Sequence, residues 1–345
     1  MKVRMSESWF SLSKKDKTEA LELAADRTGR PAHLLEKDIW VVWSLNAIYR
    51  TNLADKLTFK GGTSLSKAYK IIDRFSEDID LTYDIRELVP DLLNDSNPIP
   101  SSTSQEKRIS NAVRHRLPDW IQTEIKPIIQ ATLAESSLEA MLTVDAQNPE
   151  KLIISYPQLK SGTGYATANI LLEFGARATG EPHQVHAVSC DIASVIPSVI
   201  FPTARPLVMV AERTFWEKAT AAHVYCLQQR LRGDRYSRHW YDLSALAKSS
   251  YYESAVNDRE LGKQVAKHKS MFFTEKDAKG DKVDYHRTVE GQIQLVPAGE
   301  SLVALSQDYE AMLADGLLPK NQPTFSELME SCNAIEARLN QAHRH

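Results

Sequence analysis

The chain has 345 residues and a formal net charge of −3 at pH 7, which excludes a uniformly basic protein that coats nucleic acid. Any RNA-binding surface therefore has to be a local patch, on a chain long enough to form two lobes. No apolar run is long enough to cross a bilayer, and the N-terminus lacks the apolar core of a signal peptide, which favours a cytoplasmic protein without a membrane partner.

Residues 11–50 predict two helices. Ser13 is a suitable N-cap for a helix over Lys14–Thr28, and Pro31 suits the first turn of a second helix. This second helix has a wide apolar face, which the charged run Glu36–Asp38 interrupts. A solvated charged face is the commoner explanation of such a run.

The stretch 57–84 predicts a strand, a glycine turn, a helix and a second strand. A short apolar strand over Leu57–Lys60 ends at the pair Gly61-Gly62. Apolar residues then recur with helical spacing over Ser64–Ile72. After a polar break, Asp78–Thr82 alternates between polar and apolar residues as a strand does.

Two carboxylates of the second strand, Asp78 and Asp80, share one face because strand side chains alternate with a period of two. Side-by-side carboxylates repel each other unless a cation lies between them. The turn Gly61–Ser64 offers free backbone N–H groups and the positive end of a helix dipole to a phosphate. Together the two features suit a site for Mg²⁺ and a triphosphate. The alternative is a surface hairpin with an acidic edge.

The next part of the chain predicts a long helix in two pieces, Gln105–Leu117 and Trp120–Glu135, separated at Pro118. The first piece is either an RNA-backbone surface or a solvated helix face, because it is rich in basic residues. These residues are Lys107, Arg108, Arg114, His115 and Arg116.

Four strands are predicted after this helix, over Ala140–Asp145, Leu152–Tyr156, Ala168–Gly175 and Val185–Ser189. Because runs of strands follow a helix without regular alternation, we expect an α+β protein with a mixed, mainly antiparallel sheet.

Glu173 interrupts the apolar run Ile170–Phe174 of the third predicted strand. A carboxylate in a central strand is costly to bury unless it is paired or ligates a metal. Arg177 and Lys160 are the candidate ion-pair partners.

Pro197–Pro206 holds three prolines in ten residues and predicts a connection between lobes. Beyond it the chain predicts helices over Val210–Arg230 and Tyr236–Ala247, and later over Glu300–Leu313 and Phe325–Gln341. Three scattered cysteines without metal-type spacing predict buried thiols in a reducing compartment. They are Cys190, Cys226 and Cys332.

Charged residues of this helical part have both ordinary and functional explanations. Lys218 would ordinarily be an exposed helix lysine, and Arg238 and Asp242, four apart, can pair. Arginines gather here with aromatic residues between them, a mixture that suits phosphate contacts and stacking against unpaired bases. The arginines predicted to contact RNA are Arg230, Arg232, Arg235 and Arg238, and the aromatic residues are Tyr225, Tyr236 and Trp240.

Five segments, in order, resemble the polymerase-β-like nucleotidyltransferases and more narrowly the AbiEii/AbiGii toxin family, which includes the MenT-type toxins that add nucleotides to transfer RNA. The segments are EKDIWVVWSLNAIY (Glu36–Tyr49), GGTSLSKAY with RFSEDIDL (61–81), ILLEFGAR (Ile170–Arg177), ERTFWEKATAAH (Glu212–His223) and SRHWYDLSAL (Ser237–Leu246). One departure is that Thr63 and Ser64 follow a Gly-Gly pair where other branches have Gly-Ser. It leaves open which hydroxyl contacts the phosphates.

The resemblance implies the site residues. Asp78 and Asp80 would be metal ligands, with Glu173 as the third carboxylate and Asp145 as its competitor. The implied nucleotide-binding residues are Gly61, Gly62, Thr63, Ser64, Ser76, Lys218 and Arg238. The implied catalytic residues are Asp78, Asp80, Lys218 and Asp242. In this scheme Asp242 orients Lys218 or Arg238 and is not itself a metal ligand.

The resemblance also implies the architecture and the activity. A polymerase-β-like nucleotidyltransferase lobe with N-terminal helices would span residues 1–205, and an α-helical lobe carrying Lys218 and Asp242 would span 206–345. The enzyme would use Mg²⁺, with Mn²⁺ as the alternative, to transfer NMP from NTP to an RNA 3′ end. The expected RNA is the tRNA acceptor stem, so the toxin would block translation in a toxin–antitoxin or phage-defence system with a cognate antitoxin as partner.

Three other functions remain open from the sequence. The same fold is compatible with a protein-modifying nucleotidyltransferase that moves AMP onto a protein hydroxyl, or with an NTP-binding module that has lost turnover. Intact Asp78, Asp80 and Lys218 argue against the second. A Mg²⁺-dependent nuclease is the weakest alternative, because it would not need the Gly61–Ser64 turn.

Overall fold

A computed structural model describes residues 7–76, 78–93, 98–160, 168–229, 235–314, 316–318 and 321–341. The chain divides into two compact units. The sheet unit comprises Met1–Ala68, Phe75–Asp91 and Asn111–Val208, and the helical unit comprises Tyr69–Arg74, Leu92–Ser110 and Met209–His345. Arg230 and Arg232, predicted to contact RNA, lie outside the described residues.

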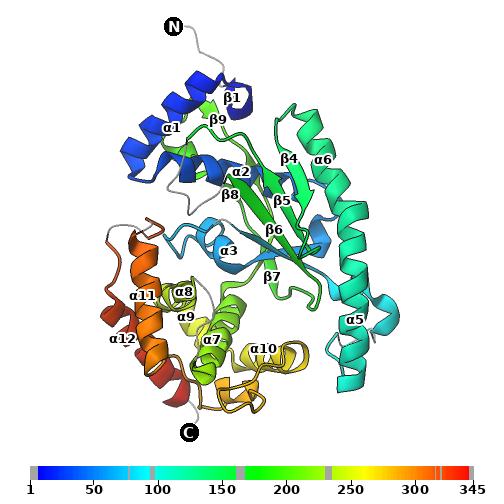
Figure 1. Cartoon of the computed structure of the whole chain (residues 1–345), viewed down its shortest axis with the longest axis vertical. Coiled ribbons are helices and arrows are strands. Elements are labelled where there is room, and N and C mark those ends of the chain that lie inside the picture. The colour runs from blue at the N-terminus through cyan, green and yellow to red at the C-terminus, as the bar shows by residue number, and fades with distance from the viewer. Residues whose placement is uncertain are drawn as a thin grey trace. The chain divides into compact units, whose positions relative to one another are not determined.

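A seven-stranded sheet forms the centre of the sheet unit, in the order β4-β5-β6-β3-β2-β11-β7 (Figure 1). Its strands are β2 (Leu57–Lys60), β3 (Ile79–Tyr83), β4 (Met141–Val144), β5 (Lys151–Ser155), β6 (Asn169–Gly175), β7 (His183–Val185) and β11 (Leu207–Met209). The pairs β4–β5, β5–β6 and β2–β3 are antiparallel, whereas β3–β6 and β2–β11 are parallel. The predicted α+β class with a mixed sheet is confirmed.

Three of the four strands predicted after the long helix are confirmed to within two residues, as β4, β5 and β6. The fourth, Val185–Ser189, is wrong as a single strand. Its residues divide between β7 in the large sheet and β8 (Val188–Ser189), which pairs with β10 (Thr203–Ala204). A second small pair joins β1 (Glu7–Ser8) to β9 (Val199–Ile200).

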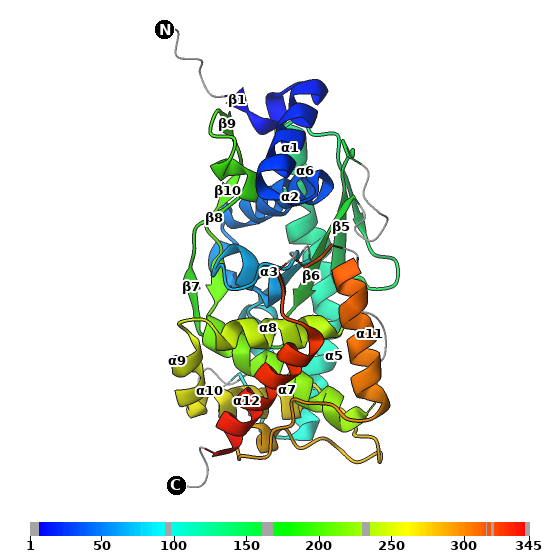
Figure 2. The same ribbon diagram turned by 90° about the vertical axis from the view of Figure 1, so that its left-hand side faces the viewer.

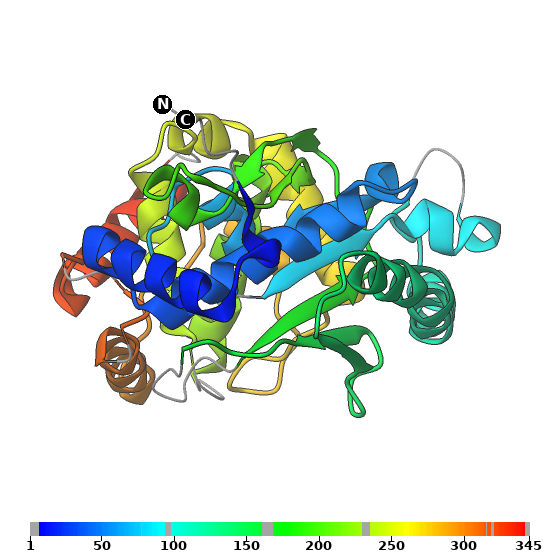
Figure 3. The same ribbon diagram turned by 90° about the horizontal axis from the view of Figure 1, so that it is seen from above.

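Two long helices begin the sheet unit. The Ser13 hydroxyl accepts the Asp16 N–H and caps α1 (Lys14–Thr28), as predicted, and Gly29 ends it with a φ of 71°. Helix α2 (Ala32–Tyr49) follows Pro31 and packs against α1, α6 (Lys126–Glu135) and β6 (Figure 3). Because α2 has neighbours on several sides, nearly every side chain along it is buried.

The predicted helix over Ser64–Ile72 is displaced towards the glycines. Helix α3 (Gly61–Lys67) starts at Gly61, and soon after its end Lys70 has a left-handed φ of 55°. The apolar spacing suggested a longer helix because Ile72 is buried, yet it lies in an irregular segment beyond the helix.

Pro118 does not separate two helices, contrary to prediction. It lies inside α5 (Thr103–Trp120), which continues through the π-helical turn Ile121–Ile125 into α6 (Figure 1). Pro118 lacks an N–H group, so the helix loses one internal hydrogen bond there. The wider π turn that follows is one of the known ways in which a helix accommodates such a defect.

Six described helices of the helical unit pack against one another, and the first two carry buried tryptophans. They are α7 (Ala211–Gln228), α8 (Ser237–Ala247), α9 (Tyr252–Asn257), α10 (Arg259–Phe272), α11 (Glu300–Ala314) and α12 (Phe325–Gln341). Helix α8 packs against α7, α11 and α12 (Figure 2). The indole N–H groups of Trp216 and Trp240 donate to the carbonyls of Ala255 (2.9 Å) and Leu295 (2.6 Å), so neither buried donor is left unsatisfied.

The four helices predicted after the proline-rich segment are confirmed as α7, α8, α11 and α12 over their described residues. All three cysteines are buried and form no disulfide. Within the described parts of the chain, no helix is both long enough and apolar enough to span a membrane.

Candidate active site

Four charged residues form a row across adjacent strands of the large sheet. Lys151 of β5 is the register partner of Glu173 of β6, which pairs with Asp80 of β3, which in turn pairs with Lys60 of β2. Register partners point to the same face of a sheet, so we call these four residues the charged row. The neighbours of Asp80 in β3, Ile79 and Leu81, are fully buried, as the predicted alternation requires.

The Asp80 carboxylate lies directly against the start of α3. A Cβ atom at Gly61 would overlap this carboxylate, and Gly61 has a positive φ of 79°, so the position requires glycine on both counts. Asp78 precedes β3 by one residue and lies two residues before Asp80. Carboxylate oxygens are the donors that Mg²⁺ prefers, and one or two carboxylates with several waters is its usual protein site. This pair of aspartates therefore fits a hard divalent cation.

Glu173 forms a hydrogen-bonded ion pair with Lys151. Lys160, one partner suggested by the sequence, pairs with Glu22 instead. Among the residues that the structure describes, no three His, Cys, Asp or Glu side chains gather closely enough to hold a metal ion. Glu173 is nevertheless the register neighbour of Asp80.

Asp145, the competitor for the third carboxylate, closes the β4–β5 turn. Its Oδ1 accepts the N–H groups of Gln147 (2.8 Å) and Asn148 (3.1 Å). These hydrogen bonds lower the pKa of Asp145. They give the carboxylate a structural role in the turn, which explains an aspartate at this position. Glu173 is therefore the better placed of the two.

The hydroxyls of Thr63 and Ser64 are fully buried and bonded within the chain. The Thr63 hydroxyl lies 2.9 Å from the Ser76 hydroxyl and 2.5 Å from the Asp78 carbonyl oxygen, and the Ser64 hydroxyl donates to the Gly61 carbonyl at 2.9 Å. These hydrogen bonds tie the first turn of α3 to the segment that leads into β3. At a helix start the groups left without intrahelical partners are the first backbone N–H groups, which suit a phosphate.

A second cluster lies within the helical unit, around the fully buried Asp242 of α8. Arg74 binds its carboxylate through two bonds, Nε to Oδ1 at 2.6 Å and Nη2 to Oδ2 at 2.7 Å. The ammonium of Lys218, on α7, lies 2.7 Å from Oδ2. Lys218 is only 8% exposed, so the interpretation as an ordinary solvated helix lysine is wrong.

Burial and neighbouring charges shift the pKa values of several groups in this cluster. Burial alone would raise the pKa of Asp242, but Arg74 and Lys218 hold it well below its ordinary value. Burial lowers the pKa of Lys218, Asp242 offsets part of this effect, and the charges of Arg74 and Arg238 lower it further. His239 beside them is held neutral, because burial puts its pKa well below the usual value. Several cations acting around one carboxylate suit the binding of phosphate.

The charged run of α2 is buried, so the expected solvated face is wrong. Glu36, Lys37 and Asp38 are 2%, 3% and 4% exposed. The two oxygens of Asp38 accept from the Lys67 ammonium (2.5 Å) and the Asp191 N–H (2.7 Å), and Lys67 also lies 2.7 Å from the Asp191 carboxylate. Since Lys67 is the last residue of α3, this network fixes the far end of the helix that begins at Gly61.

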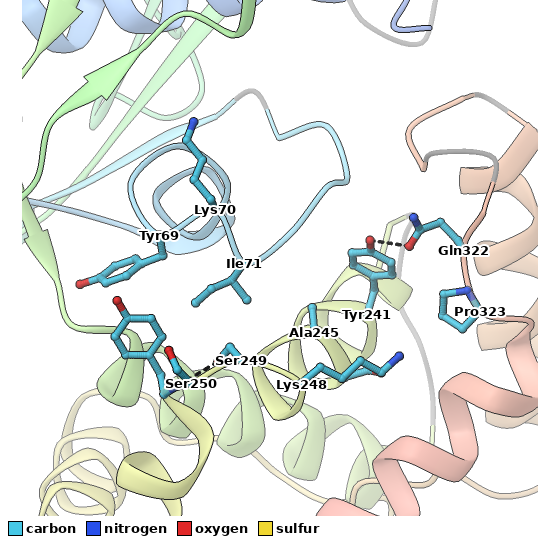
Figure 4. A pocket seen from close by; sticks show the side chains of 12 residues that line it. Tyr69, Lys70, Ile71, Tyr241, Ala245, Lys248, Ser249, Ser250, Gln322 and Pro323 are labelled. Atoms are coloured by element: carbon cyan, nitrogen blue, oxygen red, sulfur yellow. Dashed lines mark hydrogen bonds between the residues drawn. The ribbon is translucent and has the colours of Figure 1, made fainter. Parts of the chain in front are cut away.

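A pocket of about 410 Å³ lies within the helical unit, close in sequence to the second cluster. Its walls include Tyr69–Ile71, the last turn of α8 and residues 248–251 (Figure 4). Tyr241 donates a hydrogen bond to Gln322 across one side at 2.6 Å, and the ring of Tyr69 packs edge-on against Tyr251. Tyr241 directly precedes Asp242, so adjacent residues of α8 serve the pocket and the cluster. Tyr69 and Tyr241 are largely buried, so they offer little free ring surface for stacking.

The family model described as "Nucleotidyl transferase AbiEii toxin, Type IV TA system" matches residues 43–331. The chain belongs to this family. It is therefore a nucleotidyltransferase toxin of a type IV toxin–antitoxin system, as the sequence resemblance implied.

Two solved structures are similar to this AbiEii-family chain at low identity. The nucleotidyltransferase toxin MenT4 from Mycobacterium tuberculosis H37Rv has 14% identity and a TM-score of 0.45, with 97% of this chain and 89% of MenT4 covered. JHP933 from Helicobacter pylori has 15% identity and a TM-score of 0.38, with coverage of 89% and 94%. A sequence comparison with curated proteins gives no match.

In this AbiEii-family enzyme two residues join the candidate site that the sequence did not single out. Arg74 lies in the segment RFSEDIDL, which carries part of the resemblance, so its position was a usable signal. Lys151 opens a strand without any motif, and only the register of the sheet brings it to Glu173. The pair Arg238–Asp242 expected from helical spacing is replaced, around the Asp242 carboxylate, by Arg74 and Lys218.

Proposed function

We propose that the protein transfers NMP from an NTP to the 3′ end of an RNA, using a divalent cation held by Asp78 and Asp80. The observation that carries this proposal is the seating of the Asp80 carboxylate on Gly61. It puts a metal-type ligand in contact with the turn whose backbone N–H groups suit a phosphate. An acidic hairpin edge without function would not need a glycine under its carboxylate.

In the proposed reaction each residue has a separate role. A bound Mg²⁺, or Mn²⁺ as the alternative, would offset the charge of the phosphates and favour the ionised form of the acceptor hydroxyl. Lys218 would hold phosphate oxygens as a compact point charge, and Asp242 with Arg74 would keep its ammonium in place. The acceptor oxygen would bond to the α-phosphorus while the bond to the β-phosphate oxygen breaks, and pyrophosphate would leave with that electron pair.

Arg74, which binds Asp242 in the second cluster, is close in sequence to the proposed metal ligands Asp78 and Asp80. Arg74 of the helical unit comes four residues before Asp78 of the sheet unit. We therefore assign the second cluster and the metal ligands to one nucleotide.

The RNA acceptor is proposed to be the 3′ end of transfer RNA, where an added nucleotide would prevent aminoacylation and block translation. This outcome suits a toxin whose family implies an antitoxin partner. It also suits action in the cytoplasm and a role in phage defence.

Incubation of the purified chain with total RNA and each labelled NTP, with and without Mg²⁺, tests the proposal. We expect Mg²⁺-dependent label on RNA of tRNA size, and none with the Asp80→Asn variant. Label on protein would favour the protein-modifying alternative. Shortened RNA would favour a nuclease, and no labelled product with any NTP would favour an idle binding module.

A further inference from the structure

The net charge of the charged row affects how many metal ions the site can bind. It contains two lysines and two carboxylates, and Asp78 adds a third carboxylate just before β3. The formal charge of these five side chains is therefore −1. One divalent cation would bring the set to +1, whereas two would bring it to +3 on one face of the sheet, where mutual repulsion is only partly screened.

Lys151 lies beside Glu173, the register neighbour of Asp80 in the charged row. Its ammonium is ion-paired to Glu173, and the two side chains are 27% and 34% exposed, so the pair is partly shielded from water. Lys151 therefore matches the charge of Glu173, the register neighbour of Asp80.

A two-metal centre requires cations roughly 3.5–4 Å apart, held by carboxylates that serve both. Glu173 is the described carboxylate next to Asp80 in the row, and its negative charge is already matched by Lys151. We propose that Lys151 takes the place of a second metal ion, so that the protein without nucleotide binds a single divalent cation at Asp78 and Asp80. The inference rests on the proposed function for its metal ligands and adds the residue that sets the number of ions.

The test counts Mn²⁺ ions bound to the full chain without nucleotide, by titration followed with electron paramagnetic resonance. Wild type should bind one ion. Lys151→Gln should bind a second, weaker ion, because Glu173 then has an unmatched charge, and Lys151→Arg should keep one. Lys160→Gln is the matched control, since Lys160 is also a glutamate-paired lysine with a 29% exposed side chain, and it should keep one ion.

The role of Glu173 is checked in the same assay. Lys151→Gln combined with Glu173→Gln should return the count to one. Glu173→Gln alone should keep one ion with an affinity within about three-fold of wild type. If Lys151→Gln does not fold, this single variant is the test of the inference. Loss of the ion in Glu173→Gln would make Glu173 a ligand of the first ion and overturn the inference.

The outcomes separate the inference from the proposed function. Two ions on wild type, or one ion on folded Lys151→Gln, would overturn the role of Lys151 while leaving Asp78 and Asp80 as ligands. No ion on wild type, with Asp80→Asn behaving identically, would instead remove the metal assignment of the proposed function.

Discussion

Asp80 shows how much a single side chain depends on its surroundings in this site. It has Glu173 as its register neighbour on one side and the backbone of Gly61 beneath it, with Asp78 two residues earlier. Carboxylates so arranged repel one another. Lysines at both ends of the charged row reduce this repulsion but leave the set negative. As the proposed metal ligand, Asp80 would therefore cost stability when the cation is absent.

Asp80→Asn should abolish transfer while leaving the fold as stable as wild type or more stable without metal. One ligand is removed, and one repulsive charge goes with it. Transfer assays and thermal melts with and without Mg²⁺ measure both effects, with Asp26→Asn at an exposed position of α1 as control. Near-normal transfer, or a Mg²⁺-induced rise in melting temperature equal to that of wild type, would show that the metal is held elsewhere.

Lys218→Ala should lower turnover by at least about ten-fold, as expected for a charge that acts on phosphate oxygens during transfer. Lys218→Arg should not fully restore it, because a planar guanidinium does not replace a compact ammonium. Arg74 already occupies two bonding directions of Asp242, so a second guanidinium would also crowd that carboxylate. Steady-state kinetics in NTP, with Lys15→Ala at an 84% exposed position as control, measure the effect. Unchanged kinetics in Lys218→Ala would remove Lys218 from the nucleotide site.

At the scale of helices and strands, features that depend on residues nearby in sequence could be predicted. Features that depend on residues far away in sequence could not. The cap of α1 by Ser13 and the alternation of β3 are local, and both are confirmed. The burial of Asp38 depends on Asp191, which is 153 residues away, so the sequence favoured a solvated face. Likewise, the pairing of Lys151 with Glu173 follows from sheet register, which no local pattern specifies.

The same contrast between local and long-range features applies to the candidate site. Asp78, Asp80 and Lys218 were predictable because motifs carry them. The partners that hold them were not, since Arg74 reaches Asp242 across 168 positions of sequence. The end of α3 was missed for a related reason, because apolar spacing cannot distinguish a helix from an irregular buried segment.

Helix α2 supports a prediction about pH. Burial raises the pKa of Glu36 to about 7, although the N–H groups of Leu159 and Lys160 partly oppose this. A carboxyl group whose pKa is higher in the folded state contributes stability at low pH, and this contribution is lost as pH rises through the folded pKa. From its ordinary value of 4.5 to about 7, the loss is about 3 kcal/mol at 1.36 kcal/mol per pKa unit.

Glu36→Gln should therefore flatten the pH dependence of the free energy of unfolding between pH 4.5 and 8. Relative to wild type, the variant should gain stability as pH rises over this range. Urea unfolding at several pH values measures the difference, with Glu19→Gln, 63% exposed on α1, as control. An equal pH dependence in Glu36→Gln and wild type would show that Glu36 keeps an ordinary pKa.

At the scale of the whole molecule, the net charge of −3 gives no long-range attraction for RNA, so the proposed RNA substrate would have to bind through a local basic surface. The sequence places the densest group of arginines between α7 and α8, where Arg230 and Arg232 lie outside the described residues. Arg235 is described: its backbone N–H donates to Asp308 at 2.5 Å and fixes the chain just before α8. This leaves the role of its side chain to be tested directly.

Replacing Arg232 and Arg235 together by glutamine should weaken RNA binding and lower its salt slope by about one unit or less for each phosphate that an arginine no longer neutralises. NTP binding should stay nearly unchanged. Arg238 is left intact, because its charge acts on Lys218 and would mix nucleotide effects with RNA effects. RNA titrations at several salt concentrations measure the slope. If affinity and slope match wild type, the RNA path lies elsewhere, with α5 as the next candidate. There Arg116 is bound to Asp91, so Lys107, Arg108 and Arg114 are the residues to replace first.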